Sequence, residues 1–269
     1  MRISCYGNTD PGLVRDHNED AFYISEIEPL YVVADGMGGH NCGEVASRIA
    51  VETIAEFYNE TAGQEAVDLV TRTAAGSGLW PFGKKKRSAT YEELRIESSI
   101  QEANRRILEE GREDPSKSGM GTTLVSCYFT DAGVFVGHVG DSRCYRFRDG
   151  KLTQISEDHS LANEYVRMNI LAPEDVEHFP YKNVIVRALG LTEHVQVEVR
   201  LHDFLPNDRL LLCSDGLSDM LRDPEIQQVL REYEGEEDAV EELIERANDA
   251  GGVDNITVIL ATIQPSDGG

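Results

Sequence analysis

The strongest constraint on this chain is a set of four aspartates, each of which follows an apolar run of strand-like residues. They stand in Val32-Val33-Ala34-Asp35-Gly36, Val139-Gly140-Asp141-Ser142, Leu212-Cys213-Ser214-Asp215-Gly216 and Val253-Asp254-Asn255. A carboxylate at the tip of a buried strand is costly unless a positive charge lies beside it. A cluster of divalent cations is the simplest source of that charge.

The ligand chemistry favours particular cations. Every member of the set is an oxygen donor, and no Cys or His shares the motif spacing, which favours Mg²⁺ or Mn²⁺ over Zn²⁺. Gly36 has no Cβ, so its backbone can approach a metal closely and its carbonyl can serve as a ligand. An Asp-Gly pair after a strand is also a common turn signal. Asp149-Gly150, between two strand-like runs, is predicted to be such a turn and to carry no chemistry.

Six short motifs run from near the first residue of the chain to near the last. They are Arg15-Asp16-His17-Asn18-Glu19-Asp20, Asp35-Gly36-Met37-Gly38-Gly39-His40, Gly121-Thr122-Thr123-Leu124, Gly140-Asp141-Ser142-Arg143, Ser214-Asp215-Gly216-Leu217 and Asp254-Asn255-Ile256-Thr257. Their order is that of the metal-dependent protein phosphatase 2C family, which the chain resembles over its whole length. The resemblance, which is to the bacterial stand-alone branch, implies hydrolysis of phosphoserine and phosphothreonine in proteins and opposition to a bacterial Ser/Thr kinase.

The residues support the same chemistry. Two metals that share the Asp35 carboxylate can bind a bridging water, lower its pKa and aim the hydroxide at phosphorus, so no protein nucleophile is required. A phosphate ester also needs a cation on its non-reacting oxygens, and a guanidinium binds them bidentately. Arg15 is the candidate, and the resemblance assigns it that role. The alternative for Arg15 is a surface ion pair with Asp16 or Asp20.

Further residues take their roles from the resemblance. The two metals, Mn²⁺ or Mg²⁺, are expected on Asp35, Gly36, Asp215 and Asp254. Asp141, together with Asp215, is expected to hold a third and weaker metal; the alternative is a turn aspartate that accepts backbone N–H bonds. Glu19, Asp20 and Asn255 are expected around these ligands, where Glu19 and Asp20 would orient metal-bound waters.

One departure from the family concerns the proton donor. Animal-type members carry a His two residues after the metal Asp, as general acid for the leaving alkoxide, and this chain has Met37 there. His40 is the nearest substitute and could protonate the leaving oxygen near neutral pH. A role for His40 in a surface loop or at a helix start, and a metal-bound water as the acid, stay open.

A rival phosphatase chemistry is present in the same stretch. Cys42 and Arg48 have the Cys-five-residues-Arg spacing of cysteine-dependent phosphatases. That loop must wrap a dianion with free backbone amides, and Glu44 within it would repel phosphate. The segment continues with helical periodicity, so Cys42 is interpreted as a residue at the start of a helix.

The composition restricts the partners. The chain has 269 residues with 49 acidic and 25 basic side chains, a formal net charge of −24. Nucleic acid and anionic membranes are therefore not expected partners, whereas phosphoproteins and a cognate kinase are. The five cysteines form no metal pair or disulfide framework, and no signal peptide or spanning segment is seen. A cytoplasmic monomer is expected.

The expected fold is α+β, a four-layer α-β-β-α sandwich of two antiparallel sheets flanked by helices. Strands and helices group without βαβ alternation, which favours this packing, and the family implies it. Residues 1–264 are expected to form one catalytic domain with an exposed insertion at about 74–88, a flap at about 159–187 that selects substrates, and a tail at 265–269. Expected strands are Ile3–Gly7, Ala21–Ser25, Leu30–Ala34, Thr123–Phe129, Val134–Val139, Arg143–Arg148, Lys151–Ile155, Val195–Leu201, Arg209–Cys213 and Ile256–Ile263. Expected helices are Gly43–Asn59, Gln64–Thr73, Tyr91–Gly111, Ser160–Met168, Pro224–Tyr233 and Glu236–Ala250, the third with a Thr90/Glu93 capping box.

Two other functions stay open from the sequence. One is a non-catalytic, metal-binding module that recognises a phosphoprotein, against which the intact Arg15, Asp35, Asp215 and Asp254 argue. The other is a partner-switching phosphatase that acts on an anti-sigma antagonist.

Overall fold

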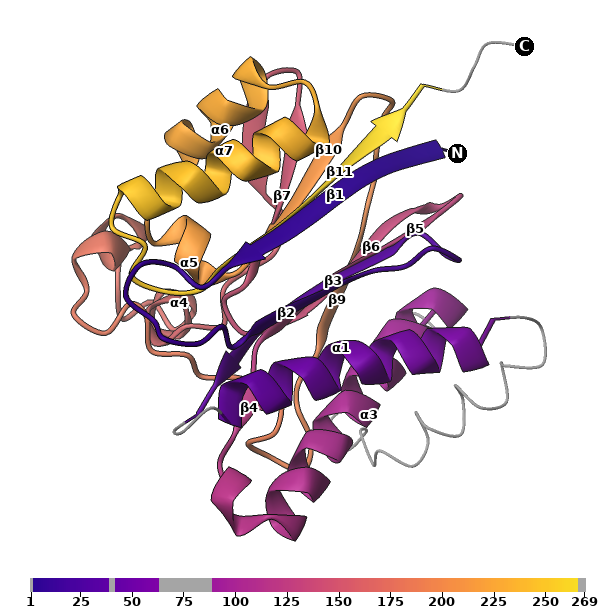
Figure 1. The fold of residues 1–269 in the computed structure, drawn as a ribbon, viewed down its shortest axis with the longest axis vertical. Helices are drawn as coiled ribbons and strands as arrows, with labels where there is room; N and C mark the ends of the chain where they lie inside the picture. The colour runs from indigo at the N-terminus through magenta and orange to yellow at the C-terminus, as the bar shows by residue number, and fades with distance from the viewer. Residues whose placement is uncertain (1, 39–41, 63–88, 266–269) are drawn as a thin grey trace.

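Two antiparallel sheets face each other, and helices cover the outer face of each (Figure 1). The structure is a computed structural model, and it describes residues 2–38, 42–62 and 89–265. The first sheet consists of β1 (Arg2–Asp10), β11 (Ile256–Gln264), β10 (Arg209–Cys213), β7 (Arg143–Arg148) and β8 (Lys151–Gln154), in that order. The second consists of β2 (Asp20–Ile24), β3 (Leu30–Met37), β5 (Leu124–Thr130), β6 (Gly133–Val139) and β9 (Glu198–His202), with the short β4 (Gly121–Thr122) paired to β3.

The helices complete the four layers. The second sheet is covered by α1 (Cys42–Glu60) and α3 (Tyr91–Glu113), and the first by α6 (Asp223–Glu232) and α7 (Glu236–Asp249). Shorter helices are α4 (Leu161–Arg167), α5 (Asp215–Ser218) and the 3-10 turns η2 (Pro115–Lys117) and η3 (Pro173–His178). The predicted α-β-β-α sandwich is confirmed. In the described part of the chain, none of the helices combines the length and the apolar character that a membrane span requires.

Three apolar cores hold the layers together. Side chains such as Val33, Val125 and Leu212 fill the space between the sheets. Because successive strand residues point to opposite faces, the residues that alternate with these point outward and pack against the helices. The outward-facing side chains of the second sheet contact α1 and α3, and the outward-facing side chains of the first sheet contact α6 and α7.

Two local predictions are confirmed in detail. At the start of α3 the backbone N–H of Thr90 donates to Glu93 Oε2 at 2.8 Å, and the N–H of Glu93 donates to Thr90 Oγ1 at 3.2 Å. This reciprocal pair is the expected capping box. Asp149 and Gly150 have φ values of 51° and 74° in the two-residue turn between β7 and β8. Positive φ at both positions is the requirement of a type I′ hairpin.

Other predictions need correction. The strand β3 continues to Met37, so Asp35 and Gly36 lie within a strand and not at its end. Asp215 opens a helical turn, α5, that apolar periodicity did not indicate because the helix is only four residues long. The expected helix Gln64–Thr73 and the insertion at about 74–88 lie in residues 63–88, outside the described part of the chain.

A buried arginine joins α3 to the end of α1. The Arg95 side chain is 3% exposed, and its Nη1 lies 2.7 Å from Glu28 Oε2. Its Nε donates to Thr61 Oγ1 and its Nη2 to the carbonyl of Tyr58, both at 2.8 Å. The guanidinium also lies 4.1 Å from the centre of the Tyr58 ring.

We expect Arg95→Ala to lower the free energy of unfolding by about 3 kcal/mol, because it leaves buried acceptors without their donor. Urea denaturation of the purified protein measures the change. Arg105→Ala is the matched control: this half-exposed side chain of the same helix makes only surface ion pairs with glutamates among the described residues, so its loss should be below about 1 kcal/mol. Equal losses of unfolding free energy in the two variants would mean that the buried contacts of Arg95 contribute no more to stability than surface ion pairs do.

Candidate metal centre

Acidic side chains from both sheets converge at one end of the sandwich. Asp20, the first residue of β2, pairs in register with Asp35 of β3 in the second sheet. Asp215 follows β10 and Asp254 precedes β11, and these two strands are neighbours in the first sheet. The carboxylates therefore meet at the seam between the two sheets.

The carboxyl groups of Asp35 and Asp215 are close enough for each to change the pKa of the other. Burial raises the pKa of Asp35 well above its usual range, and the charges of Asp20 and Asp215 raise it further. Burial, with Asp219 and Asp254, raises the pKa of Asp215 to about 6. Ionisation of both acids is therefore unfavourable unless a cation balances their charge.

Two hydroxyl groups of the first sheet hold Asp20. Ser214 Oγ and Thr257 Oγ1 each donate to Asp20 Oδ2 at 2.7 Å. Burial is the main cause that raises the pKa of Asp20 to about 7, and these two hydrogen bonds oppose it. Asp20 therefore fixes the second sheet to the first at the point where the acidic groups meet.

The backbone of Asp35 is held from the neighbouring chain segment. Thr122 Oγ1 and the N–H of Thr123 both donate to the Asp35 carbonyl at 2.8 Å, and the Asp35 N–H donates to Thr123 Oγ1 at 3.2 Å. Thr123 Oγ1 also lies 2.6 Å from Ser142 Oγ. The Thr-Thr motif thus sets the position of Asp35 and links it to the turn at Asp141.

Gly36 has a packing reason to lack a side chain. A Cβ there would lie 2.1 Å from the Gly43 carbonyl oxygen and 2.4 Å from that of Glu19. The Gly36 N–H donates to the Glu19 carbonyl at 3.1 Å. The Glu19 carboxyl accepts the N–H of Gly43 at the start of α1; burial raises its pKa, and this bond lowers it. The backbones of β3 at Gly36, of the loop at Glu19 and of α1 at Gly43 are therefore in direct contact, with no room for a side chain at Gly36.

Asn255 organises the loop between β1 and β2. Its Oδ1 accepts the Glu19 N–H at 2.7 Å, and its Nδ2 donates to the carbonyls of Pro11 and His17, both at 2.9 Å. The Leu13 N–H also donates to the Gly252 carbonyl at 2.7 Å. The amide of Asn255 is therefore committed to the backbone of the loop that carries Arg15.

Arg15 lies at the edge of the carboxylate group. Its Nη2 is 2.7 Å from Asp254 Oδ2, and half of its side-chain surface is exposed. The alternative from the sequence named Asp16 or Asp20 as its ion-pair partner, and the partner is Asp254 instead. The guanidinium is thus next to the acidic centre and accessible from solvent.

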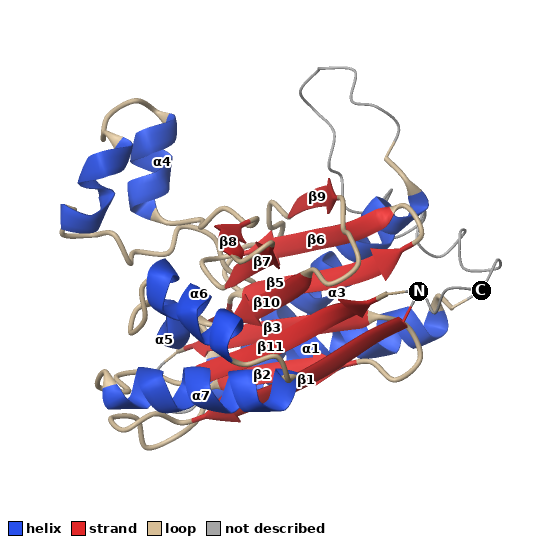
Figure 2. Ribbon diagram, turned by 90° about the horizontal axis from the view of Figure 1, so that it is seen from above, coloured by secondary structure: helices blue, strands red, loops and turns tan. Residues whose placement is uncertain are grey.

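Asp141 is buried beside Asp215, and among the described residues its Oδ1 has no hydrogen-bond partner. Burial, then Asp215 and Asp158, raise its pKa to about 7. It lines a cleft of about 510 Å³ together with Asp215, Asp219 and Lys182. Lys182 belongs to the flap segment 159–187, which includes α4 and projects from the sandwich (Figure 2).

The flap touches the rim of this cleft. Asn183 Nδ2 donates to Asp219 Oδ2 at 2.8 Å, and the Asp219 N–H donates to the Asp215 carbonyl at 2.7 Å. Asp219 therefore links the flap to the helical turn that carries Asp215.

The donor set fits hard divalent cations. It consists of carboxylate oxygens, it is partly buried, and Asp141 Oδ1 is a buried acceptor without a donor among the described residues. Uncompensated charges of this kind are not stable in a protein interior. Mg²⁺ or Mn²⁺ would satisfy them with the ligands these ions prefer.

His40 lies in residues 39–41, outside the described part of the chain. The rival cysteine site is not formed. Cys42 is the first residue of α1, buried, with its Sγ 3.3 Å from the Ser116 carbonyl, and Arg48 is exposed on the same helix. No loop of free amides surrounds this thiol in the described residues, so Cys42 starts a helix as predicted.

Sequence reasoning missed the hydroxyl groups that hold the aspartates. Ser214 and Thr257 lie within the motifs of Asp215 and Asp254, and Thr123 and Ser142 lie in two others. Their signal was their presence in those motifs. Spacing along the chain does not show that a hydroxyl of one sheet reaches a carboxylate of the other.

Known proteins resemble this chain over nearly its whole length. The family model described as protein phosphatase 2C matches residues 14–260. The serine/threonine phosphatase stp of Listeria monocytogenes is 36% identical over 255 residues, 94% of this chain and 92% of that protein. The crystal structure of the Mycobacterium tuberculosis serine/threonine phosphatase PstP/Ppp superposes with a TM-score of 0.81 at 32% identity, covering 98% of this chain and 99% of that one. A PstP catalytic domain in complex with two manganese ions has a TM-score of 0.72 at 32% identity, with 98% and 99% covered.

The raised carboxyl pKa values predict how stability depends on pH. Asp20, Asp141 and Asp215 bind protons more tightly in the folded chain than in the unfolded one. In chelator, these groups therefore favour folding below about pH 4, and their contribution is lost as the pH rises through about 6 to 7. Mn²⁺ bound at Asp141 and Asp215 would displace their protons and favour the ionised form of Asp20, so the gain in Tm on adding Mn²⁺ should be larger near pH 8 than near pH 5.

Differential scanning calorimetry with chelator and with saturating Mn²⁺ measures this gain. The comparison at each pH cancels the surface carboxylates elsewhere in the chain, which titrate in both samples. A gain that is the same at both pH values would contradict a link between these aspartates and the cations.

Proposed function

Because the chain belongs to the protein phosphatase 2C family, we propose that it hydrolyses phosphoserine and phosphothreonine in phosphoproteins with two Mn²⁺ or Mg²⁺ ions. One observation carries the proposal: Asp35 and Asp215 lie in a buried group of mutually repelling acids, whose ionised form requires cations. The solved PstP catalytic domain with two manganese ions supports it.

The residues divide into two sets. Asp35, Asp215, Asp254 and the carbonyl of Gly36 would hold the two cations, and Asp141 with Asp215 would hold a third. When bound, the pair of cations would supply a water activated for attack on phosphorus and would neutralise charge on the phosphate. Glu19, Asp20 and Asn255 set the positions of these ligands through the contacts described above.

The protein's own contribution to substrate binding is Arg15. Its planar guanidinium can hold two non-reacting phosphate oxygens, because a fork of N–H groups matches that geometry. Asn255 donates hydrogen bonds to the backbone of the loop that carries Arg15. The backbone from which the Arg15 side chain extends is therefore held in one position. His40 would donate the proton to the leaving oxygen, which a serine or threonine alkoxide needs.

Substrates and partners follow from the same assignment. Phosphoproteins made by a Ser/Thr kinase are the proposed substrates, so the enzyme would act in signal transduction by opposing that kinase. The flap beside the cleft would contact residues around the phosphorylated side chain, since Lys182 and Asn183 lie at the rim. Residues 1–264 would form a single catalytic unit.

The decisive assay is hydrolysis of an aryl phosphate and of a phosphothreonine peptide with Mn²⁺, with Mg²⁺ and with chelator. Release of phosphate from both substrates with metal, and none with chelator, is the expected result. Binding of the phosphopeptide without turnover under every condition would favour the non-catalytic module instead.

Asp35→Asn should abolish hydrolysis, because a neutral amide cannot balance two dications and the attacking water loses its activation. Phosphate release at saturating Mn²⁺ measures the effect. Asp149→Asn, in the β7–β8 hairpin turn, is the matched control and should leave turnover unchanged. Near wild-type turnover by Asp35→Asn would rule out the two-metal assignment.

Arg15→Ala should lower kcat/KM by on the order of 10-fold to 1,000-fold, the loss of a charge-assisted pair with phosphate. Affinity for Mn²⁺ should not fall, since the variant only removes the partner of Asp254. Arg15→Lys keeps the charge without the fork and should be intermediate, while Arg48→Ala on exposed α1 surface should match the wild type. A loss of Mn²⁺ affinity with unchanged substrate affinity would make Arg15 part of the scaffold.

A further inference from the structure

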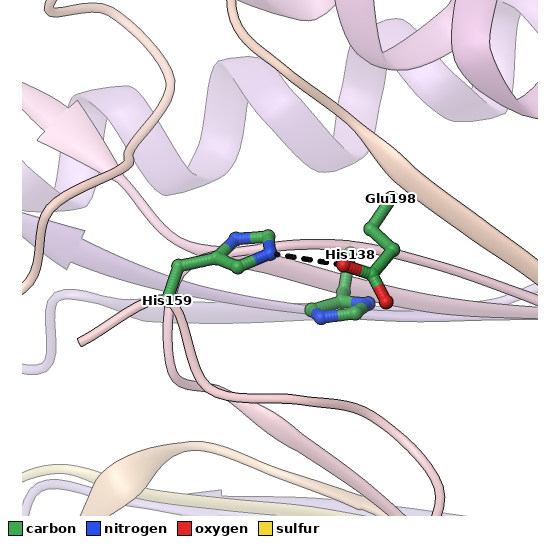
Figure 3. A group of neighbouring side chains, drawn as sticks. All are labelled: His138, His159 and Glu198. Carbon is green, nitrogen blue, oxygen red and sulfur yellow. Dashed lines mark ion pairs between the residues drawn. The ribbon is translucent and has the colours of Figure 1, made fainter. Parts of the chain in front are cut away.

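Two buried imidazoles and a carboxylate lie behind the turn that carries Asp141. The rings of His138, in β6, and His159 stack with their centres 4.7 Å apart and their planes 16° from parallel. Glu198, opposite His138 in β9, faces them, and His159 Nε2 points to its carboxylate (Figure 3). The ligand atoms of the three residues lie within 4.8 Å of one another, close enough to suggest a metal site.

The hydrogen bonds of His159 argue against a metal there. The Gly140 N–H donates to His159 Nδ1 at 3.1 Å, so Nδ1 must offer a lone pair. In the neutral ring the proton is then on Nε2, and Nε2 faces Glu198 Oε2 at 3.6 Å. A cation on Nε2 would require loss of that proton as well, since a metal-bound His normally donates its other N–H. The proton on Nε2 therefore faces the Glu198 carboxylate beyond hydrogen-bond distance, and the ring is not arranged as a metal ligand.

The same residue holds the turn by two bonds. The His159 backbone N–H donates to the Gly140 carbonyl at 2.9 Å, which adds to the bond between the Gly140 N–H and the ring. Gly140 has φ of 104°, and a Cβ there would lie 2.6 Å from Thr123 side-chain atoms. His138 Nε2 lies 2.8 Å from the Glu157 carbonyl and ties the same two segments together. Gly140 is thus fixed directly before Asp141.

Asp141 needs such a restraint. Its carboxylate is buried beside Asp215, a like charge, and its Oδ1 has no partner among the described residues. An unrestrained turn would relieve this repulsion by rotating the side chain toward solvent. Gly140 is held by His159 on one side, and Ser142 is held by Thr123 at 2.6 Å on the other. The two ties keep Asp141 directed into the cleft.

We propose that His159, through its two bonds to Gly140, is the positioning residue that holds Asp141 in place to bind a third divalent cation in the cleft. The proposal rests on the proposed function, because it assigns a cation to Asp141. Charge agrees with it: burial and His159 lower the pKa of His138 to about 4, so that ring is neutral near pH 7. The His159 contact, with His138 and Arg200, lowers the pKa of Glu198 to about 2, so an ionised carboxylate faces the Nε2–H at 3.6 Å and attracts it electrostatically.

The first test needs no variant. A long-range ¹H–¹⁵N NMR spectrum of the wild-type protein in chelator reports which ring nitrogen of His159 carries the proton. The expected result is a protonated Nε2, an unprotonated Nδ1 and a Gly140 amide protected from exchange. A protonated Nδ1 would overturn the proposal, because the Gly140 N–H would then have no acceptor in the ring.

The second test compares two substitutions in Mn²⁺ binding, measured by electron paramagnetic resonance of the free ion. His159→Asn keeps an acceptor at the position of Nδ1, whereas His159→Leu has a similar volume and no acceptor. His159→Leu should weaken the weakest Mn²⁺ site by about 10-fold to 100-fold, the usual effect of losing a group that orients a ligand. His159→Asn should stay close to the wild type, and so should Glu198→Gln, which keeps an acceptor for Nε2–H.

Asp141→Asn is the reference variant and should lose the same weakest site. Equal Mn²⁺ binding by His159→Leu and the wild type would overturn the proposal, as would equal losses in His159→Leu and His159→Asn. If Asp141→Asn binds Mn²⁺ as the wild type does, the proposal falls while the two-metal assignment, which Asp35→Asn tests, stands.

Discussion

Repulsion among buried carboxylates is the constraint on which the rest of the structure depends. Asp35 and Asp215 are buried near each other, and the charges of neighbouring aspartates, Asp254 among them, raise the pKa of both. A chain that folds with these groups together must either protonate them or bind cations. The surrounding hydrogen bonds act as restraints against that repulsion, since they hold Asp35 through its backbone and Asp20 through one carboxylate oxygen.

The restraints also explain why the centre lies at the seam between the sheets. Asp20 belongs to one sheet and accepts hydrogen bonds from Ser214 and Thr257 of the other. Asn255 fixes the loop that carries Arg15 to the start of β11. Substitutions in these ties are therefore expected to change the geometry of the centre without touching a ligand. The same hydrogen bonds that join the two sheets also set the positions of the acidic groups proposed to bind cations.

The sequence predicted the elements better than their connections. Apolar runs predicted the strands, and the Thr90/Glu93 pair predicted the start of α3. These predictions succeeded because each signal depends only on residues that are near one another in the sequence. Asp35 was expected at a strand end, but β3 pairs through Gly36 with the short β4, a contact set by distant residues. The motif aspartates were found from their positions after apolar runs. The imidazole of His159 was not, since its role depends on Gly140, nineteen residues away.

Charge sets the order in which the centre can be filled. The whole chain carries a formal charge of −24, and a phosphate dianion would be repelled from a group of ionised aspartates. In the cation-free chain Asp254 also neutralises Arg15, the residue proposed to hold phosphate. Cations that balance Asp254 would leave the guanidinium free for phosphate oxygens and would make the local potential less negative. Phosphate affinity should therefore depend on cation binding even before any bond is broken, since both effects act through the same carboxylate.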